Sequence, residues 1–124
     1  MSLLKHQMLY EALTSNEALM AKVSCITDEP LPDVQAPYIV MGETYEGNGE
    51  LVDNSCAAVV VTLHIWSNYR GRKEVLEIRD LLVKALPDWC LFEMFEVNSD
   101  TERDSQDSVW WHGIFEIRYF DERK

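Results

Sequence analysis

The alternation of apolar and polar positions predicts a strand in the middle of the chain. The segment from Ser55 to Trp66 reads SCAAVVVTLHIW, and its odd-numbered positions from 57 to 65 are all apolar. Because successive side chains of a strand point to opposite faces of a sheet, we expect these positions to share one face. The other face is then lined by Ala58, Val60, Thr62, His64 and Trp66. This is the strongest strand signal in the sequence.

Four more segments are typical of strands. They are a short one within Val23 to Thr27, YIVMGETYE from Tyr38 to Glu46, LFEMFEV from Leu91 to Val97, and VWWHGIFEIRYF from Val109 to Phe120. The last strand is expected to place Val109, Trp111, Phe115, Ile117 and Tyr119 on one face and His112, Glu116 and Arg118 on the other. The polar loops 47–54 and 98–108 are long for hairpin turns, so each is either mobile or an arm that orders on binding a partner.

Apolar residues at helical spacing mark two other regions. The first runs from Ser2 to about Val23, where residues 14–16 interrupt it and Asn16 can cap a second piece from Glu17 to Lys22. The second runs from Gly71 to Leu86 and is ended by Pro87. Its apolar stripe consists of Val75, Ile78, Leu82 and Ala85. Three prolines make the segment 28–37 an irregular linker.

The order of these elements predicts an α+β fold. We expect an antiparallel sheet of four to five strands, built from two hairpins, with the helices packed on one face. A chain of 124 residues has room for one hydrophobic core, so residues 1–124 are expected to form a single domain.

Charge and composition exclude several classes of partner. The chain has 11 lysines and arginines against 22 aspartates and glutamates, a net charge of −11. This balance argues against phosphate-driven binding of nucleic acid and against docking on an anionic membrane. No signal peptide is recognisable at the N-terminus, and the longest apolar run is too short to span a bilayer. The three cysteines, Cys25, Cys56 and Cys90, are widely spaced and are expected to be reduced and buried.

Enzyme motifs are largely absent. The sequence contains no GxGxxG, P-loop, HExxH or GxSxG. His64 and His112 lie on two predicted strands, where they can be neighbours. Together with Glu116 they could form a metal site, but the favoured interpretation is that they are solvated or part of an interface. We therefore expect no catalytic residue, no metal and no cofactor.

Tryptophans and charged clusters suggest an interaction surface. Trp110 and Trp111 must point to opposite faces, so one of them leaves the core and is either half-exposed or part of an oligomer interface. Basic residues cluster at one helix start and are either solvated or paired with an acidic loop of a neighbouring subunit. The candidate interface residues are Trp66, Arg70, Arg72, Lys73, Trp110, Glu50, Asp53, Asp100, Glu102 and Asp104.

Four stretches of the sequence resemble the tail-terminator, or tail-completion, proteins of tailed bacteriophages. Their opening helix resembles LLKHQMLYEALTSNEALMAKV, and their Pro-Tyr-aliphatic strand resembles PYIVMGE. Their strand–Trp-Ser–turn–helix signature is similar to LHIWSNYRGRKEVLEIRDLLVKAL, and their final strand to GIFEIRYF. The resemblance runs over nearly the whole chain in the same order.

The resemblance implies a structural assembly protein without catalysis or cofactor. It implies a ring, usually a hexamer, that caps the tail tube, ends its polymerisation and joins the head. The implied partners are further copies of the chain, the tail tube protein and the head–tail connector protein, with DNA only passing through the lumen. The implied location is the virion tail, reached from the cytoplasm of the bacterial host.

Two other classes of function remain open. A monomeric acidic binding module, such as an inhibitor or DNA mimic, would bind a basic partner with an affinity that falls steeply in salt. A small enzyme would need a deep pocket with convergent titratable groups, and the sequence singles out no nucleophile for it.

Overall fold

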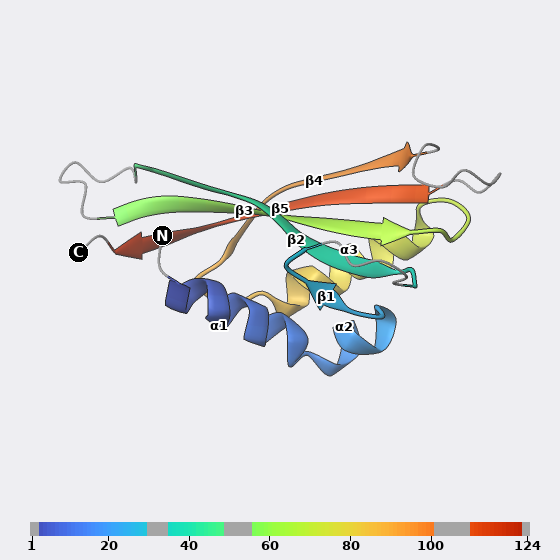
Figure 1. The fold of residues 1–124 in the computed structure, drawn as a ribbon, viewed down its shortest axis with the longest axis horizontal. Helices are drawn as coiled ribbons and strands as arrows, with labels where there is room; N and C mark the ends of the chain where they lie inside the picture. Colours follow the sequence, from blue (N-terminus) through green and yellow to red (C-terminus); the bar gives the residue numbers. More distant parts are fainter. Residues whose placement is uncertain (1–2, 30–34, 49–55, 101–109, 123–124) are drawn as a thin grey trace.

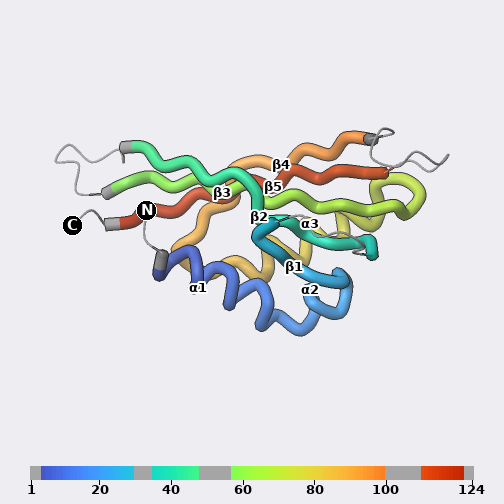
Figure 2. The backbone as a smooth tube through the Cα atoms, viewed as in Figure 1, coloured from blue at the N-terminus to red at the C-terminus, as the bar shows by residue number. Residues whose placement is uncertain are grey.

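The computed structural model describes residues 3–29, 35–48, 56–100 and 110–122 (Figure 1). Its elements are α1 (Leu3–Thr14), α2 (Glu17–Lys22), β1 (Ile26–Thr27), β2 (Tyr38–Asn48), β3 (Cys56–Ser67), α3 (Lys73–Ala85), β4 (Leu91–Asp100) and β5 (Trp110–Glu122). The start of α1 and the end of β5 lie at the same end of the sheet (Figure 2). There the Lys5 Nζ donates a hydrogen bond of 2.5 Å to the carbonyl oxygen of Phe120.

The five strands form one sheet in the order β1-β2-β3-β5-β4. The two predicted hairpins are confirmed, because β2 pairs antiparallel with β3 and β4 pairs antiparallel with β5. The sheet is mixed rather than wholly antiparallel, since the short β1 runs parallel to β2. The α+β fold is confirmed, and all three described helices lie on one side of the sheet (Figure 1).

Strand bounds differ from the prediction at the polar ends. β2 continues to Asn48 and β4 continues to Asp100, into segments expected as loops. Asp100 is therefore not a loop residue: it lies in β4, opposite Trp110 of β5. Backbone pairing with the neighbouring strand satisfies the polar groups of these residues, so the ladder continues despite their polar side chains. The rest of the two predicted loops, 49–54 and 101–108, lies outside the described residues.

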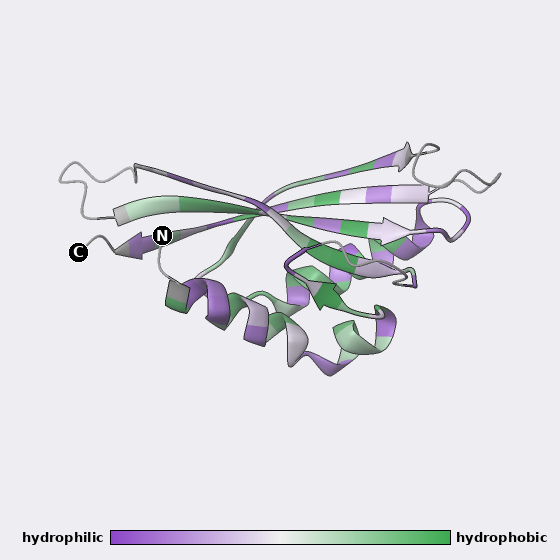
Figure 3. Cartoon of the chain, in the orientation of Figure 1, coloured by the Kyte–Doolittle hydropathy of each residue, from purple (hydrophilic) through white to green (hydrophobic). Residues whose placement is uncertain are grey.

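The core lies between the sheet and the helices. As the alternation predicted, Ala57, Val59, Val61, Leu63 and Ile65 of β3 are buried, and the last four are fully buried. They pack with the buried β5 residues Phe115, Ile117 and Tyr119 and with the helical residues Leu9, Leu13, Leu19, Val75, Ile78 and Leu82. Figure 3 colours the first half of β3 as one continuous hydrophobic stretch, because apolar residues also occupy its other face.

Local signals explain where the helices begin. The side chain of Asn16 accepts a hydrogen bond of 2.9 Å from the Leu19 N–H, as expected for a cap of α2. α3 begins at Lys73, two residues later than predicted. The reason is Gly71, whose φ of +78° is left-handed and incompatible with a helix, so this glycine forms the turn that precedes α3.

Candidate interaction face of the sheet

The sheet face opposite the helices carries many apolar and aromatic residues, with polar ones between them. We call it the open face. It is defined by Tyr38, Val40 and Tyr45 of β2, Ala58, Val60, Thr62, His64 and Trp66 of β3, Leu91, Met94, Glu96 and Asn98 of β4, and Trp110, His112, Ile114, Glu116, Arg118 and Phe120 of β5. No helix of the described ranges covers this face (Figure 1). Most of its side chains are half-buried by their neighbours; Tyr38 and Val40 are buried, and Tyr45, Leu91, Met94 and Phe120 are exposed.

The two predicted tryptophan orientations are confirmed. Trp111 packs against the core on the helix side, while Trp110 lies on the open face. There the ring of Trp110 meets the ring of Tyr38 edge-on, with centroids 6.5 Å apart. Trp66 lies on the same face, directly opposite His112 of β5. The open face therefore holds two tryptophans, a residue type that anchors interfaces.

Three rings form a stack on this face. The indole of Trp66 and the imidazole of His112 are nearly parallel, with centroids 3.9 Å apart and planes at 6°. The His112 Nε2 lies 2.6 Å from the Nδ1 of His64, whose ring is also stacked on it. One of these nitrogens must donate and the other accept, so the two histidines share a single proton across this contact.

A carboxylate lies at one end of these three rings, and together they form a row. Glu43 Oε2 lies 2.8 Å from the Nε2 of His64. This hydrogen bond is the largest cause that lowers the pKa of the Glu43 carboxyl, and a backbone hydrogen bond and the charges of both histidines act in the same direction. Glu43 therefore remains ionised at neutral pH and gives the row a negative end.

An irregularity in β2 positions this carboxylate. The register of β2 against β3 shifts between Met41 and Thr44, so Gly42 and Glu43 form a bulge. A Cβ atom at residue 42 would lie 2.4 Å from Cδ2 and 2.6 Å from Nε2 of His64. Only glycine leaves room for the imidazole to lie over the strand and reach Glu43.

The metal site considered from the sequence is not formed. His64 and His112 do turn out to be neighbours, but their nitrogens face each other, and the acidic partner of His64 is Glu43. Glu116 lies farther along β5, opposite Thr62 and Met94. Within residues 3–29, 35–48, 56–100 and 110–122, no three histidine, cysteine or acidic side chains come together as metal ligands.

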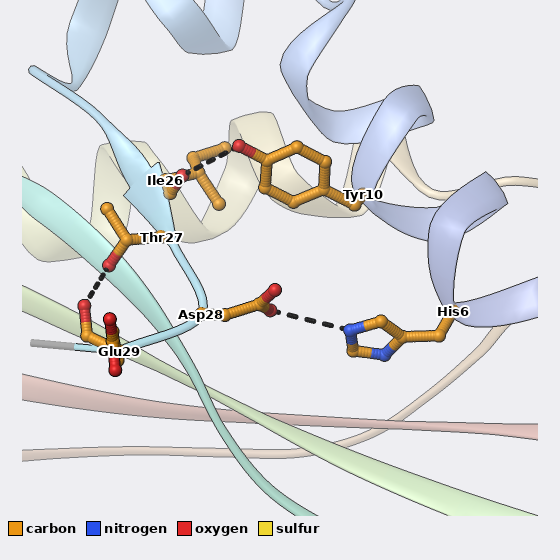
Figure 4. Close-up of polar contacts among 6 residues, drawn as sticks. All are labelled: His6, Tyr10, Ile26, Thr27, Asp28 and Glu29. Atoms are coloured by element: carbon orange, nitrogen blue, oxygen red, sulfur yellow. Dashed lines mark hydrogen bonds and ion pairs between the residues drawn. The ribbon is translucent and has the colours of Figure 1, made fainter. Parts of the chain in front are cut away.

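A groove of about 460 Å³ runs beside the row of rings. It is lined by Asp28, Val40, Met41, Gly42, Glu43, His64, Trp66 and His112. Asp28 follows β1, and its Oδ1 lies 3.4 Å from the Nε2 of His6 on α1 (Figure 4). Nearby, the Tyr10 hydroxyl donates to the carbonyl of Ile26, which ties α1 to β1 (Figure 4). The two carboxylates of the groove are mostly exposed, 65% for Asp28 and 75% for Glu43.

The predicted basic cluster is divided by the fold. The guanidinium of Arg72 lies over the Trp111 ring on the helix side, 4.7 Å from the ring centre, and makes a cation–π contact with it. Arg70 and Lys73 are exposed. Among the acidic candidates, Glu50, Asp53, Glu102 and Asp104 lie outside the described residues, so their pairing with this cluster stays a prediction.

Sequence reasoning missed Glu43 as a member of the site. The strand alternation correctly placed His64 on the open face, but a bulge changes the face of the residues that follow it. Gly42 inside a strand pattern was the available signal, because an interior glycine often marks a bulge. Nothing in the spacing indicated which carboxylate the bulge would bring to the histidines.

These features describe an α+β domain whose exposed sheet face suits contact with other proteins. The chain belongs to the family of phage tail completion proteins, since the family model described as "Tail completion protein gp17" matches residues 7–120. It is thus a phage tail assembly protein and a structural virion component, not an enzyme. No curated protein sequence matches the chain. No described helix is long and apolar enough to cross a membrane.

Solved structures give the same fold. The gp17 protein of bacteriophage SPP1 is 23% identical, with a TM-score of 0.60 over 95% of this chain and 88% of that one. A chain from the virion of a native gene transfer agent particle is 15% identical, with a TM-score of 0.65 over 91% of this chain and 92% of that one. At these identities the similarity establishes the fold alone.

Proposed function

We propose that the chain completes the phage tail by forming a ring, a hexamer, on the end of the tail tube. The ring ends polymerisation of the tube and offers the surface to which the DNA-filled head is joined. Its partners are further copies of the chain, the tail tube protein and the head–tail connector protein. The chain waits in the host cytoplasm and becomes part of the virion tail on assembly.

The open face is the observation that carries this proposal. A soluble monomer rarely leaves a contiguous apolar surface without a use, and such surfaces mark protein interaction sites. Here two tryptophans and a phenylalanine share one sheet face with Val60 and Ile114. Aromatic residues at the centre of an interface supply much of its binding energy. Self-association through this face accounts for its composition.

The negative charge of the chain supports passage of DNA without binding. A ring around the tube end encloses a channel, and a net charge of −11 on each copy repels phosphates from its wall. DNA is then cargo that moves through the lumen, and no basic surface retains it.

Electron microscopy of lysates tests the proposal. We expect a phage or prophage lacking this gene to produce DNA-filled heads without tails, beside tubes of uncontrolled length. The intact gene supplied in trans restores joined particles with tails of uniform length. Normal tails on heads in the absence of the gene would overturn the proposal and favour a monomeric acidic binding module.

A further inference from the structure

The groove beside the row of rings has the chemistry of a binding site for a guanidinium group. Two carboxylates, Asp28 just after β1 and Glu43 of β2, reach it from different segments, and both are mostly exposed. The stacked rings of Trp66 and His112 form part of its wall. Arginine binds to carboxylates through paired hydrogen bonds and also packs against aromatic rings. An arginine side chain of a partner therefore fits the groove better than a lysine or an apolar group.

The turn between β3 and α3 carries an arginine that is accessible to such a groove on another molecule. Arg70 is exposed, and within the described part of the chain it has no ion pair, hydrogen bond or ring contact. Its neighbour Tyr69 is 50% exposed. Tyrosine and arginine are the residue types most enriched among interface hot spots, together with tryptophan. The turn lies at one end of the sheet, beyond β3 (Figure 1).

The turn is also held in one conformation. The buried hydroxyl of Ser67 donates a hydrogen bond of 2.6 Å to Glu74 Oε1 and accepts one of 3.1 Å from the Tyr69 N–H. Gly71 supplies the left-handed residue that the turn requires. Because the turn is already ordered, little conformational entropy is lost when it inserts into a partner.

We propose that the groove of one copy binds Arg70 of a second copy of this chain. Charge complementarity favours this occupant, since the groove is negative and Arg70 is a cation unpaired within the described residues of a chain with a net charge of −11. In the proposed ring each groove binds Arg70 of the next copy, so the contact is head-to-tail, the type of contact from which rings are built. The inference rests on the proposed function, for which it names the contact between neighbouring subunits.

An NMR titration tests the contact even if it is weak. The ¹⁵N-labelled chain carries Arg70→Gln, which leaves its groove intact and removes its own arginine. Adding unlabelled wild-type chain is expected to shift the indole N–H signal of Trp66 in a saturable way. The signal of Trp89, which packs against the core and the ring of Tyr119 on the helix side, should stay in place. Unlabelled Arg70→Gln is expected to bind about tenfold more weakly or worse. Unlabelled Lys84→Gln, which removes an exposed cation of α3, should act like wild type.

Two results would overturn the contact. One is the absence of a Trp66 shift with the wild-type chain, and the other is an equal shift with Arg70→Gln. If the tube protein shifts the Trp66 signal and a second copy does not, the groove belongs to a different partner and the proposal is also wrong.

Charge exchange gives an independent test. Arg70→Glu retains the groove, and Glu43→Arg retains the turn. If Arg70 of one copy binds the groove of another, an equimolar mixture of the two variants gives a shift of Trp66 in the first variant, although neither self-associates alone. Tail assembly in the gene-deleted phage separates failure of the contact from failure of the proposed function. If a gene carrying Arg70→Glu restores normal tails, only the contact is contradicted. If normal tails form without the gene, the proposed function is contradicted.

Discussion

Val60 and Val61 are neighbours on β3, yet they belong to two different surfaces. Val61 is fully buried against the helices, while Val60 lies on the open face and is only half-buried. The sequence places apolar residues on both faces of β3, but the described helices cover only one of them (Figure 1). A sheet with apolar residues on both faces needs cover on both. The comparison teaches that one face provides the folded core, while the helices leave the other uncovered, which is the face we propose for assembly.

Replacing each of these valines by alanine measures the difference directly. Val61→Ala removes two buried methyl groups and leaves a cavity in the core, so we expect it to lower the free energy of unfolding by about 2–3 kcal/mol. Val60→Ala is the matched control and should cost about 1 kcal/mol or less. Chemical denaturation of both variants gives the values. Equal losses would mean that the two faces are equally important for folding.

The bulge offers a second comparison, within the open face. Gly42→Ala forces its Cβ against the His64 ring, so the ring must move and its bond to Glu43 is broken. We expect a loss of about 1–2 kcal/mol in unfolding free energy. The NMR signals of the His64 and His112 rings should change with it. Gly47→Ala is a milder control, because its Cβ would come no closer than 3.3 Å to the Tyr45 side chain. Unchanged His64 and His112 signals in Gly42→Ala would contradict the arrangement.

High pH tests the helix side of the sheet. Burial raises the pKa of Cys90 from 9.0 to about 12, and it is also the main cause that raises the pKa of Tyr119 from 10.0 to about 12. The unfolded chain releases these protons at lower pH than the folded chain, so stability is fully present below pH 9 and falls as pH rises toward 12. The expected slope is at most about 1.4 kcal/mol per pH unit for each group.

Removing the Tyr119 hydroxyl separates its part of this effect. Within the described residues this hydroxyl is buried without a hydrogen-bond partner. Tyr119→Phe should therefore leave the stability at neutral pH unchanged or raise it by up to about 1 kcal/mol. It should also flatten the loss above pH 10, measured by thermal unfolding across pH. A large loss at neutral pH would show that the hydroxyl has a partner.

The smallest expected effect concerns Glu43. Because this side chain is mostly exposed, Glu43→Gln should change the free energy of unfolding by less than about 0.5 kcal/mol. Because the pKa of the Glu43 carboxyl is lowered in the folded chain, the stability contributed by its contact with His64 is present above pH 4.5. This contribution is lost as pH falls through the folded-state pKa. The variant should lose this acid dependence while it still folds. A large change in stability at neutral pH would place Glu43 in folding rather than in binding.

The sequence predicted the core face better than the open face. The alternation at 57–65 and the helical stripe of Val75, Ile78 and Leu82 were enough for the core, because burial imposes a strict period. The mixed sheet was missed, since a two-residue strand such as β1 carries too little pattern to give its direction. The contact between Glu43 and His64 was missed as well, because it depends on a bulge and on a partner 21 residues away.

The central claim is that the open face assembles the tail while the opposite face folds the chain. Its most direct test is electron microscopy of a gene-deleted phage supplied with Val60→Glu or with Val83→Glu, an exposed valine on α3. Both proteins are first confirmed to be folded by circular dichroism. We predict headless tubes and tailless heads with Val60→Glu, and normal tailed particles with Val83→Glu. Normal particles with a folded Val60→Glu protein would contradict the claim.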